Sequence, residues 1–345
     1  MSSIDPPLSD YDLAQRMIEH GLICQGESEQ QALEKFIKSV GYYRLEEYTW
    51  PHRLVLSSKE NKRSSKFKKK VTFRNIKNTY LFDRRLRILL MDAMERFEIA
   101  LKNRITQILT QASASNTPHA EDILFINANK IDKWREELQK TYKGNQEVRI
   151  LHCKNHHSIS EVKDLPLWIL ISLCTFGDVK KLYELMTDSL KDALACDFGV
   201  SRDFLTASIM LFHKVRNKCA HHSRIWNVAW TRPKKEKSQN STPIFGAIFQ
   251  DERWFYIWNE VSCKWELPGG GKKKLTFNPK NTAFVFILAG LWLDMIAQTS
   301  RWKTRVLSTV EHKKRLLHNA REAGFPSHWS EHPLWDSSFD TPAGA

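Results

Sequence analysis

The class of fold follows from residues 73–113, which read FRNIKNTYLFDRRLRILLMDAMERFEIALKNRITQILTQAS. Apolar side chains recur every three or four residues from Ile76 to Ile108, and neither glycine nor proline interrupts them. This spacing places the apolar side chains on one face of an α-helix of roughly ten turns. Because that face must be covered by other elements, the chain is predicted to be a mostly α bundle.

Shorter helical patterns lie on both sides of this long helix. They occupy residues 9–40, 134–138, 165–185, 201–220, 283–299 and 302–323. Ser9 and Ser28 are candidate N-caps in the first of them, Gly41 is a candidate stop, and Gly177 is a candidate break. These patterns predict that the bundle is built from helices before and after residues 73–113.

We divide the chain into five segments on composition. They are an N-terminal helical region (1–56), a basic linker (57–72), a helical core (73–230), an irregular insertion (231–282) and C-terminal helices that complete the core (283–345). The lysine-rich linker is typical of an exposed loop or a charged arm. The insertion contains turn-forming residues and three tryptophans, Trp254, Trp258 and Trp265, which indicate a short strand-like piece.

The composition indicates an anionic partner. The formal net charge is +14, from 53 basic and 39 acidic residues, in a chain of 345 residues. Nucleic acid and an anionic membrane both satisfy this charge. The most apolar run, residues 283–297, contains Asp294 and is too short to span a bilayer, and residues 1–11 have no apolar signal-peptide core. The six cysteines are scattered singly, which favours a reducing compartment, so we expect a cytoplasmic protein without membrane partners.

Chemistry is concentrated in residues 214–224, which read KVRNKCAHHSR. On a helix Asn217 and His221 share a face, and Arg216 flanks them. An arginine can hold a phosphate through two hydrogen bonds, and a histidine can exchange a proton near neutral pH. The basic residues around them are further candidates for RNA contact, namely Lys214, Lys218, His222 and Arg224.

Those side chains suit RNA cleavage without a metal ion, and no cofactor or metal site is predicted. A base would take the proton from the ribose 2′-hydroxyl, which attacks the adjacent phosphorus, and an acid would protonate the leaving 5′-oxygen. Arginine would offset the charge on the phosphoryl oxygens. One histidine can hardly fill both roles, so two copies of the segment facing each other in a homodimer would supply the missing group.

The Arg-to-His spacing by itself is weak evidence. Four arginines are followed by a histidine after four to six intervening residues: Arg149, Arg216, Arg305 and Arg321. Charges near the end of a helix also interact with its dipole and its last carbonyl groups, without any catalytic role. Spacing therefore leaves both interpretations of the Arg216 segment open.

Five blocks of sequence resemble the Abi-like family, the AbiD/AbiF group of phage-resistance proteins. They are VGYYRLEEY (40–48), YLFDRRLRILLMDAMERFEIA (80–100), LPLWILISLCTFGDVKKLY (165–183), VRNKCAHHSRIWN (215–227) and GFPSHWSEHPLW (324–335). The blocks occur in the family's order along nearly the whole chain. The chain departs from the family pattern at residues 45–48, where a small residue and glycine are common.

The resemblance implies a HEPN-type helical bundle, because the family is assigned to the HEPN superfamily. The superfamily motif is arginine, a polar residue, three to five residues and a histidine. Carried over, Arg216 is the phosphate-handling arginine, Asn217 the polar position and His221 the catalytic histidine. Relatives also imply a site shared across a dimer, a role in phage defence or toxin–antitoxin behaviour, and association with a non-coding RNA.

Several other residues have two open interpretations. Tyr43 and Arg44, which follow Tyr42, could stack on bases and bind phosphate, or could form a packing corner between the N-terminal helices and the core. Trp168 and Phe176 are predicted to be core residues. Three histidines at 152, 156 and 157 could suggest a metal site, but they lack acidic partners at ligand spacing.

Two classes of function follow. The first is a metal-independent endoribonuclease in antiphage defence, with RNA as its substrate. The second is an inactive HEPN module that binds a structured non-coding RNA and acts as the scaffold of a ribonucleoprotein. A purely protein-binding role is disfavoured by the net charge of +14. Loss of RNA cleavage on replacing Arg216 or His221 discriminates the two classes.

Overall fold

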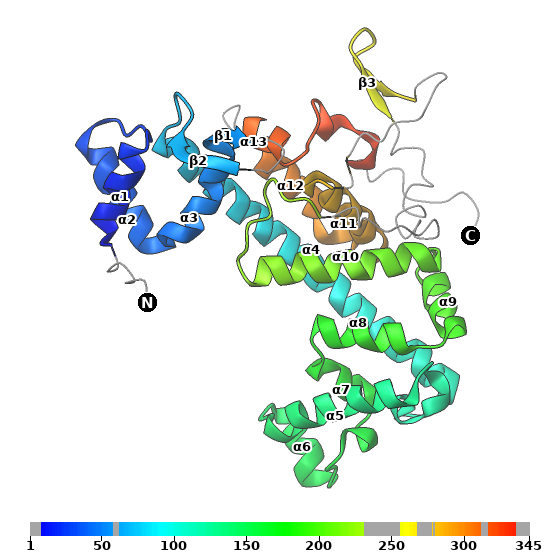
Figure 1. Ribbon diagram of the computed structural model, residues 1–345. Helices are drawn as coiled ribbons and strands as arrows, with labels where there is room; N and C mark the ends of the chain where they lie inside the picture. Colours follow the sequence, from blue (N-terminus) through cyan, green and yellow to red (C-terminus); the bar gives the residue numbers. More distant parts are fainter. Residues whose placement is uncertain are drawn as a thin grey trace.

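The fold is organised around one helix that crosses the whole molecule. The computed structural model describes residues 8–57, 62–230, 256–267, 278, 280–311 and 317–335. Helices dominate these residues, which confirms the mostly α prediction. In Figure 1, α4 (Phe73–Ser113) runs from the N-terminal elements at one end to a lobe of shorter helices at the other.

The long helix α4 has the bounds that its sequence pattern predicts. It begins at Thr72, whose hydroxyl accepts from the Asn75 amide while the Asn75 side chain accepts from the Thr72 amide. It ends at Ala114, which adopts the left-handed conformation with φ 52°. Sixteen of its residues are buried, among them Phe82, Leu86, Leu90, Phe97, Leu101 and Ile105. The repeating apolar face is therefore the core of the molecule.

Three helices precede α4; the second and third contact its first turns, and the first packs against the second. They are α1 (Asp10–Glu19), α2 (Gly26–Val40) and α3 (Tyr42–Thr49), followed by the 3₁₀ turn η1 (Trp50–His52). Ser9 caps α1 in a capping box, as predicted, whereas α2 begins two residues before the predicted Ser28. Gly41 separates α2 from α3 with φ 89°, a conformation that favours glycine. The Phe36 ring of α2 contacts Phe73 and Tyr80 of α4, with centroids 5.8 and 5.4 Å apart.

The predicted basic linker contains a strand. The antiparallel hairpin β1 (Arg53–Ser57) and β2 (Lys62–Phe67) pairs Arg53 with Phe67 and Val55 with Arg63. The Arg63 guanidinium donates to the Arg53 carbonyl at 3.1 Å, and Phe67 is buried at the end of β2. The composition of β2 did not indicate a strand, because most of its side chains are polar and at least partly exposed, as they are in a loop.

The far end of α4 carries a lobe of short elements, drawn in the lower half of Figure 1. Its elements are η2 (Pro118–Ala120), η3 (Asp122–Leu124), α5 (Ala128–Gly144), α6 (Val148–His156), η4 (Val162–Asp164), α7 (Leu167–Leu173), α8 (Phe176–Leu185) and α9 (Asp188–Asp197). The helix break predicted at Gly177 lies at Cys174 and Thr175 instead. Thr175 and Asp178 form a capping box there, so α8 begins at Phe176, one residue before the glycine.

Stability of this lobe is expected to fall in acid because of His119, which is fully buried. Its Nε2–H donates to the Val162 carbonyl at 2.7 Å, and burial lowers the His119 pKa from 6.5 to about 4. Between pH 6.5 and about pH 4, His119 binds a proton in the unfolded chain but not in the folded chain. The free energy of unfolding therefore falls as the pH falls. The loss from this group is about 2 kcal/mol between pH 7 and pH 5.

Denaturant unfolding of the wild type and of His119→Gln at these two pH values measures that loss. Glutamine retains a donor for the Val162 carbonyl but does not titrate, so the variant should lose less stability on acidification than the wild type. Equal losses in the two proteins would show that His119 is not responsible.

The remaining helices close the core around the middle of α4. They are α10 (Arg202–Ala220), α11 (Thr282–Ile296), α12 (Trp302–Glu311) and α13 (Leu317–Glu322), with the 3₁₀ turns η7 (Gln298–Ser300), η9 (Trp329–Glu331) and η10 (Pro333–Trp335). The Phe97 ring of α4 meets Phe212 of α10 and Trp292 of α11, with centroids 4.9 and 4.7 Å apart. Within the described residues, no helix is long and apolar enough to cross a membrane.

Part of the predicted insertion is a second small hairpin, β3 (Ile257–Asn259) and β4 (Lys264–Glu266). Trp258 pairs with Trp265 in its register, which confirms the strand-like prediction at those two residues. Trp254, and the lysines at 234, 235, 237 and 272–274, lie outside the described residues.

Candidate functional site

The chemistry-bearing segment forms the last turns of α10 and the turn that follows. Ser201 caps the start of the helix, and His221 is the C-cap residue. His222 adopts the left-handed conformation with φ 56°, so its amide reaches the Cys219 carbonyl at 3.0 Å and the Ser223 amide reaches the Lys218 carbonyl at 2.8 Å. This pair of hydrogen bonds is a Schellman motif. It fixes the backbone on which His221 is held.

One face of this helix end is open to solvent. Val215 and Cys219 are buried and anchor the other face, and burial raises the pKa of the Cys219 thiol to about 12, so this cysteine is not a nucleophile. A cavity of about 320 Å³ lies on the open face. Its lining residues are His213, Lys214, Asn217, Lys218, His221, Ser223, Ala229 and Trp230, and none of them is acidic.

Four of the nine predicted site residues line this cavity. Asn217 and His221 line it beside Lys214 and Lys218, and the imidazole of His221 is exposed. Arg216 does not line the cavity but flanks it, with a side chain that is 32% exposed. Exposed His222 and half-buried Arg224 belong to the following turn and are not lining residues either.

Arg216 is held by a carboxylate of α4. Its Nε lies 3.7 Å from Oε2 of Glu98, whose other oxygen lies 2.9 Å from the Lys102 ammonium. The Arg216 Nη1 also lies 3.5 Å from the side-chain Oδ1 of Asn217, at the limit of a hydrogen bond. Glu98 is shared with Lys102 and approaches only the Nε of Arg216. The guanidinium has five N–H donors, so others remain that could bind a phosphate.

His213 is a site residue that the sequence analysis missed. It lies four residues before Asn217, and its Nε2 is 3.1 Å from the Asn217 Nδ2, which donates to it. Burial lowers the His213 pKa, as do the cations Lys180 and Arg216, so the ring is neutral and can accept. Gly177 leaves room beside the ring, because a Cβ there would lie 3.4 Å from Nε2. The spacing of four residues between His213 and Asn217 was the sequence signal that could have identified this residue.

The two imidazoles of the cavity are too far apart to act on one phosphate. His213 and His221 are separated by eight residues, so the helical rise places their Cα atoms about 12 Å apart. Both side chains tilt in the same direction along the axis, which preserves the offset. His213 therefore orients Asn217, and His221 is the imidazole available to a substrate.

The Tyr42–Arg44 segment lies against the same turn. The Arg44 guanidinium donates to the His222 carbonyl at 3.1 Å, across 178 residues of sequence. Tyr42 is half-buried, whereas Tyr43 is 81% exposed, and their rings meet edge to face at 5.6 Å. Arg44 thus forms the predicted packing corner, while Tyr43 keeps a free aromatic surface beside the site.

A family comparison covers the elements that build this site. A family model described as Abi-like protein matches residues 35–227, which is more than half of the chain. The chain belongs to the Abi-like family. The match includes four of the five sequence blocks and ends before the fifth, residues 324–335. Membership implies a role in abortive infection, a defence against phage. Searches of curated proteins and of solved structures gave no match.

A buried carboxylate ties three blocks of this Abi-like protein together. Asp83 of α4 accepts from the Tyr48 hydroxyl of α3 and from the Arg87 guanidinium. Its other oxygen accepts from the backbone amides of Ile225 and Trp226, at 3.0 and 2.6 Å. Burial raises the pKa of the Tyr48 phenol, which therefore remains a donor. Asp83 holds the chain immediately after the α10 turn, so it positions the site without lining it.

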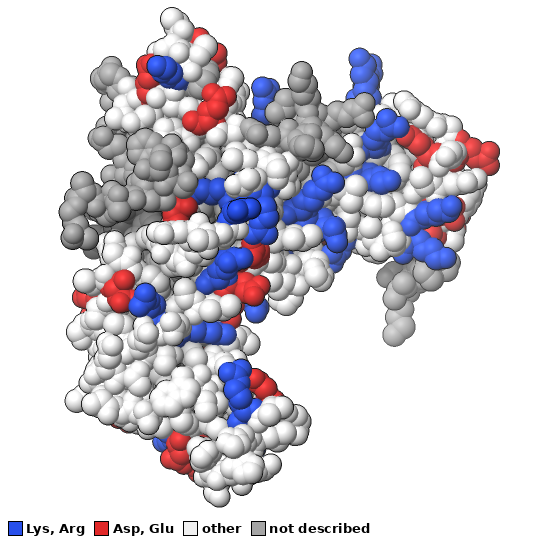
Figure 2. All heavy atoms as spheres, turned by 180° about the vertical axis from the view of Figure 1, so that it is seen from behind, with Lys and Arg blue, Asp and Glu red and all other residues white. Residues whose placement is uncertain are grey.

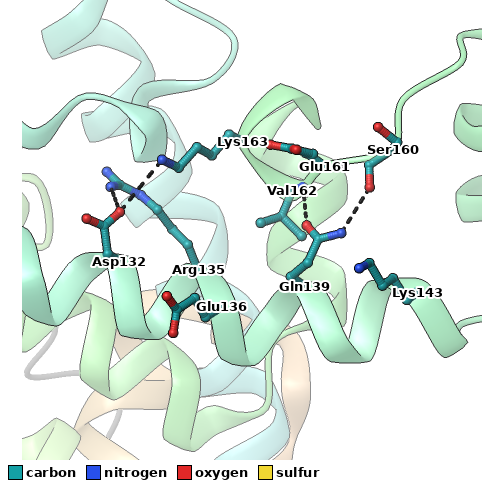
Figure 3. A pocket seen from close by; sticks show the side chains of 9 residues that line it. All are labelled: Asp132, Arg135, Glu136, Gln139, Lys143, Ser160, Glu161, Val162 and Lys163. Atoms are coloured by element: carbon teal, nitrogen blue, oxygen red, sulfur yellow. Dashed lines mark hydrogen bonds and ion pairs between the residues drawn. The ribbon is translucent and has the colours of Figure 1, made fainter.

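Two larger hollows lie elsewhere in the described part of this Abi-like protein. A groove of about 530 Å³ between α5 and η4 (Figure 3) is lined by three carboxylates and three cations, and Arg135 contacts Asp132 there at 2.7 Å. Within the described part of the chain, no group of three or more His, Cys, Asp or Glu residues could hold a metal ion.

Positive charge is concentrated on one face of the molecule. Figure 2, which views the molecule from behind relative to Figure 1, shows Lys and Arg side chains gathered across the middle of this face, with fewer Asp and Glu among them.

Proposed function

We propose that this Abi-like protein is a metal-independent endoribonuclease of the HEPN type that acts in antiphage abortive infection. The observation that supports it best is the cavity at the end of α10, where His221, Asn217 and two lysines meet without a carboxylate. A polyanion is favoured there, and one exposed imidazole is available for proton transfer. The test is RNA cleavage by the purified protein and by variants at Arg216 and His221.

In this proposal the scissile phosphate enters beside Lys214 and Lys218 and contacts Arg216. A phosphate oxygen would take the place of Glu98 at the guanidinium, since the ion pair is long at 3.7 Å and Lys102 also holds that carboxylate. His221 then exchanges the proton of the ribose 2′-hydroxyl or of the leaving 5′-oxygen. Arg216 offsets the charge that gathers on the phosphoryl oxygens.

A second copy of the chain would supply the other proton-transfer group. His213 is about 12 Å along the helix from His221, so one chain presents one usable imidazole per phosphate. The exposed end of α10 leaves His221 accessible to a partner copy. We therefore propose a homodimer in which two α10 ends face each other, and light scattering of the purified protein measures its mass.

Removing His213 should lower turnover without removing RNA binding. His213→Ala frees the Asn217 amide, whose carbonyl oxygen then no longer faces Arg216 reliably, and we expect cleavage to slow about tenfold. His213→Gln should restore most of the rate, because its side-chain oxygen can accept from Asn217. Single-turnover rates and RNA affinities of both variants test this. Two variants that are equally slow, or equally fast, would contradict an orienting role for His213.

A second function is favoured by the ion pair between Arg216 and Glu98. If Glu98 keeps the guanidinium in the presence of RNA, the protein is a HEPN scaffold that binds a structured non-coding RNA without cutting it. This alternative predicts tight, salt-sensitive binding of one RNA. Purification from the native host, followed by sequencing of the RNA that accompanies the protein, tests it. A single abundant small RNA with no cleavage activity would favour the scaffold.

A further inference from the structure

Trp168 is exposed, contrary to its prediction as a core residue. It lies in the first turn of α7, and 48% of its surface is accessible, whereas Phe176 is fully buried as predicted. Trp168 is exposed because it lies on the outer face of this short helix. The buried face carries Leu167, Leu170 and Ile171. An indole held on the surface of a basic protein needs a role beyond packing.

The indole borders a cavity of about 550 Å³ between α6 and α7. This volume lies in the range of small-molecule sites, about 300 to 1,000 Å³. Its lining includes Arg149, His152, His157 and the apolar side chains of Ile159 and Ile169. Apolar walls are thus combined with one permanent cation and two imidazoles, and none of the lining residues is acidic.

The cationic side of the cavity is accessible. The Arg149 side chain is 69% exposed and pairs with Glu147 at 2.9 Å. Such exposed ion pairs contribute little free energy, so a phosphate can replace the carboxylate. The His152 ring lies 4.6 Å from His156 and 5.2 Å from His157, centroid to centroid. The imidazoles therefore form one cluster beside the indole.

The groove in Figure 3 lacks this combination of properties. Asp132, Glu136 and Glu161 alternate there with Arg135, Lys143 and Lys163, and no aromatic side chain lines it. Three carboxylates repel a polyanion and offset the three cations. Of these two hollows, the cavity beside Trp168 alone combines an aromatic ring and a cation with a lining that has no carboxylate.

We infer that the Trp168 cavity binds an unpaired nucleotide of the RNA, as a second contact outside the α10 site. The base stacks on the indole, and its phosphate lies at Arg149 beside the imidazole cluster. Stacking on an aromatic ring is how proteins hold single-stranded bases without regard to sequence. The inference rests on the proposed RNA binding but not on cleavage, so it holds equally for a nuclease and for a scaffold.

The experiment measures the affinity of the full-length protein for a fluorescent, unstructured oligouridine. His221→Ala is present in every sample, so that no cleavage interferes. Trp168→Ala should weaken binding about 5- to 150-fold, the effect of losing one stacked base. Trp168→Phe should keep most of the affinity, because phenylalanine also stacks. Arg149→Ala should lower the salt dependence of binding by about one phosphate contact.

The matched control is Ile123→Ala, which removes a side chain that is 83% exposed and does not line the cavity. It should bind as the parent does. Unchanged affinity in Trp168→Ala, with binding intact in the parent, would overturn the inference. A parent protein that binds no RNA would instead refute the proposed RNA function, and this contact with it.

Discussion

Arg216→Ala and His221→Ala proteins are expected to bind RNA and to cut it at least about 100-fold more slowly than the wild type. General acid–base catalysis by a positioned histidine contributes about 100- to 10,000-fold. A charged donor to the developing oxyanion contributes about 100- to 1,000-fold. Both side chains lie at the solvent-exposed end of α10, with Arg216 32% exposed and His221 exposed, so their removal leaves the core intact.

The measurement is single-turnover cleavage of labelled RNA, with circular dichroism and RNA affinity recorded for each variant. His328→Ala is the matched control, since it removes a 43% exposed imidazole that does not line the α10 cavity. The control should cut RNA at the wild-type rate. Cleavage that survives both the Arg216 and the His221 changes would remove the α10 site from the reaction.

The largest effect on stability is expected from Asp83→Asn. The Asp83 carboxylate is fully buried and accepts four hydrogen bonds, including one from the Arg87 guanidinium, which is 5% exposed. An amide in its place cannot neutralise Arg87 and presents a donor to groups that are themselves donors. Breaking a buried ion pair in this way costs about 3–5 kcal/mol.

Denaturant unfolding of Asp83→Asn measures this cost, and Asp92→Asn is its control on the same helix. Asp92 also contacts two arginines, Arg96 at 3.1 Å and Arg305, but its side chain is 25% exposed. Its replacement should cost less than about 1 kcal/mol. If the two variants lose the same stability, Asp83 is not the structural link between α3, α4 and the α10 turn.

Asp83 also explains why the site depends on residues far from it in sequence. Its contacts reach Tyr48, 35 residues before it, and the amides of Ile225 and Trp226, more than 140 residues after it. Arg44 adds a contact to the His222 carbonyl from the same N-terminal region. The α10 turn is therefore clamped from two sides, and both clamps lie within the part of the chain that matches the Abi-like family.

Local periodicity was sufficient to predict the helices that carry the site. The long helix α4 and the helix α10 begin and end within one residue of their predicted bounds, because apolar spacing and capping residues act over a few neighbours. The helical spacing of four residues also predicted that Asn217 and His221 share one face, and both side chains line one cavity. Trp226 and Trp230, which stand four residues apart after the motif as core side chains on one helix face do, are both buried.

Contacts between distant residues were not predictable from spacing. Trp168 fits an apolar helical pattern equally well whether or not another element covers it, and only the tertiary arrangement leaves it exposed. The role of Asp83 depends on donors from three separate segments. Strand β2 is polar because solvent covers it, so its composition resembles that of a linker. These features arise from packing, which a local pattern does not contain.

The most direct test of the proposed function is the chemistry of the RNA ends that the purified protein produces in the presence of a strong metal chelator. Attack by the ribose 2′-hydroxyl, with proton transfer by His221, needs no metal ion and leaves a 2′,3′-cyclic phosphate and a 5′-hydroxyl. We expect these ends from the wild-type protein and their loss in His221→Ala. Cleavage that stops with the chelator, or that leaves a 5′-phosphate, would contradict it.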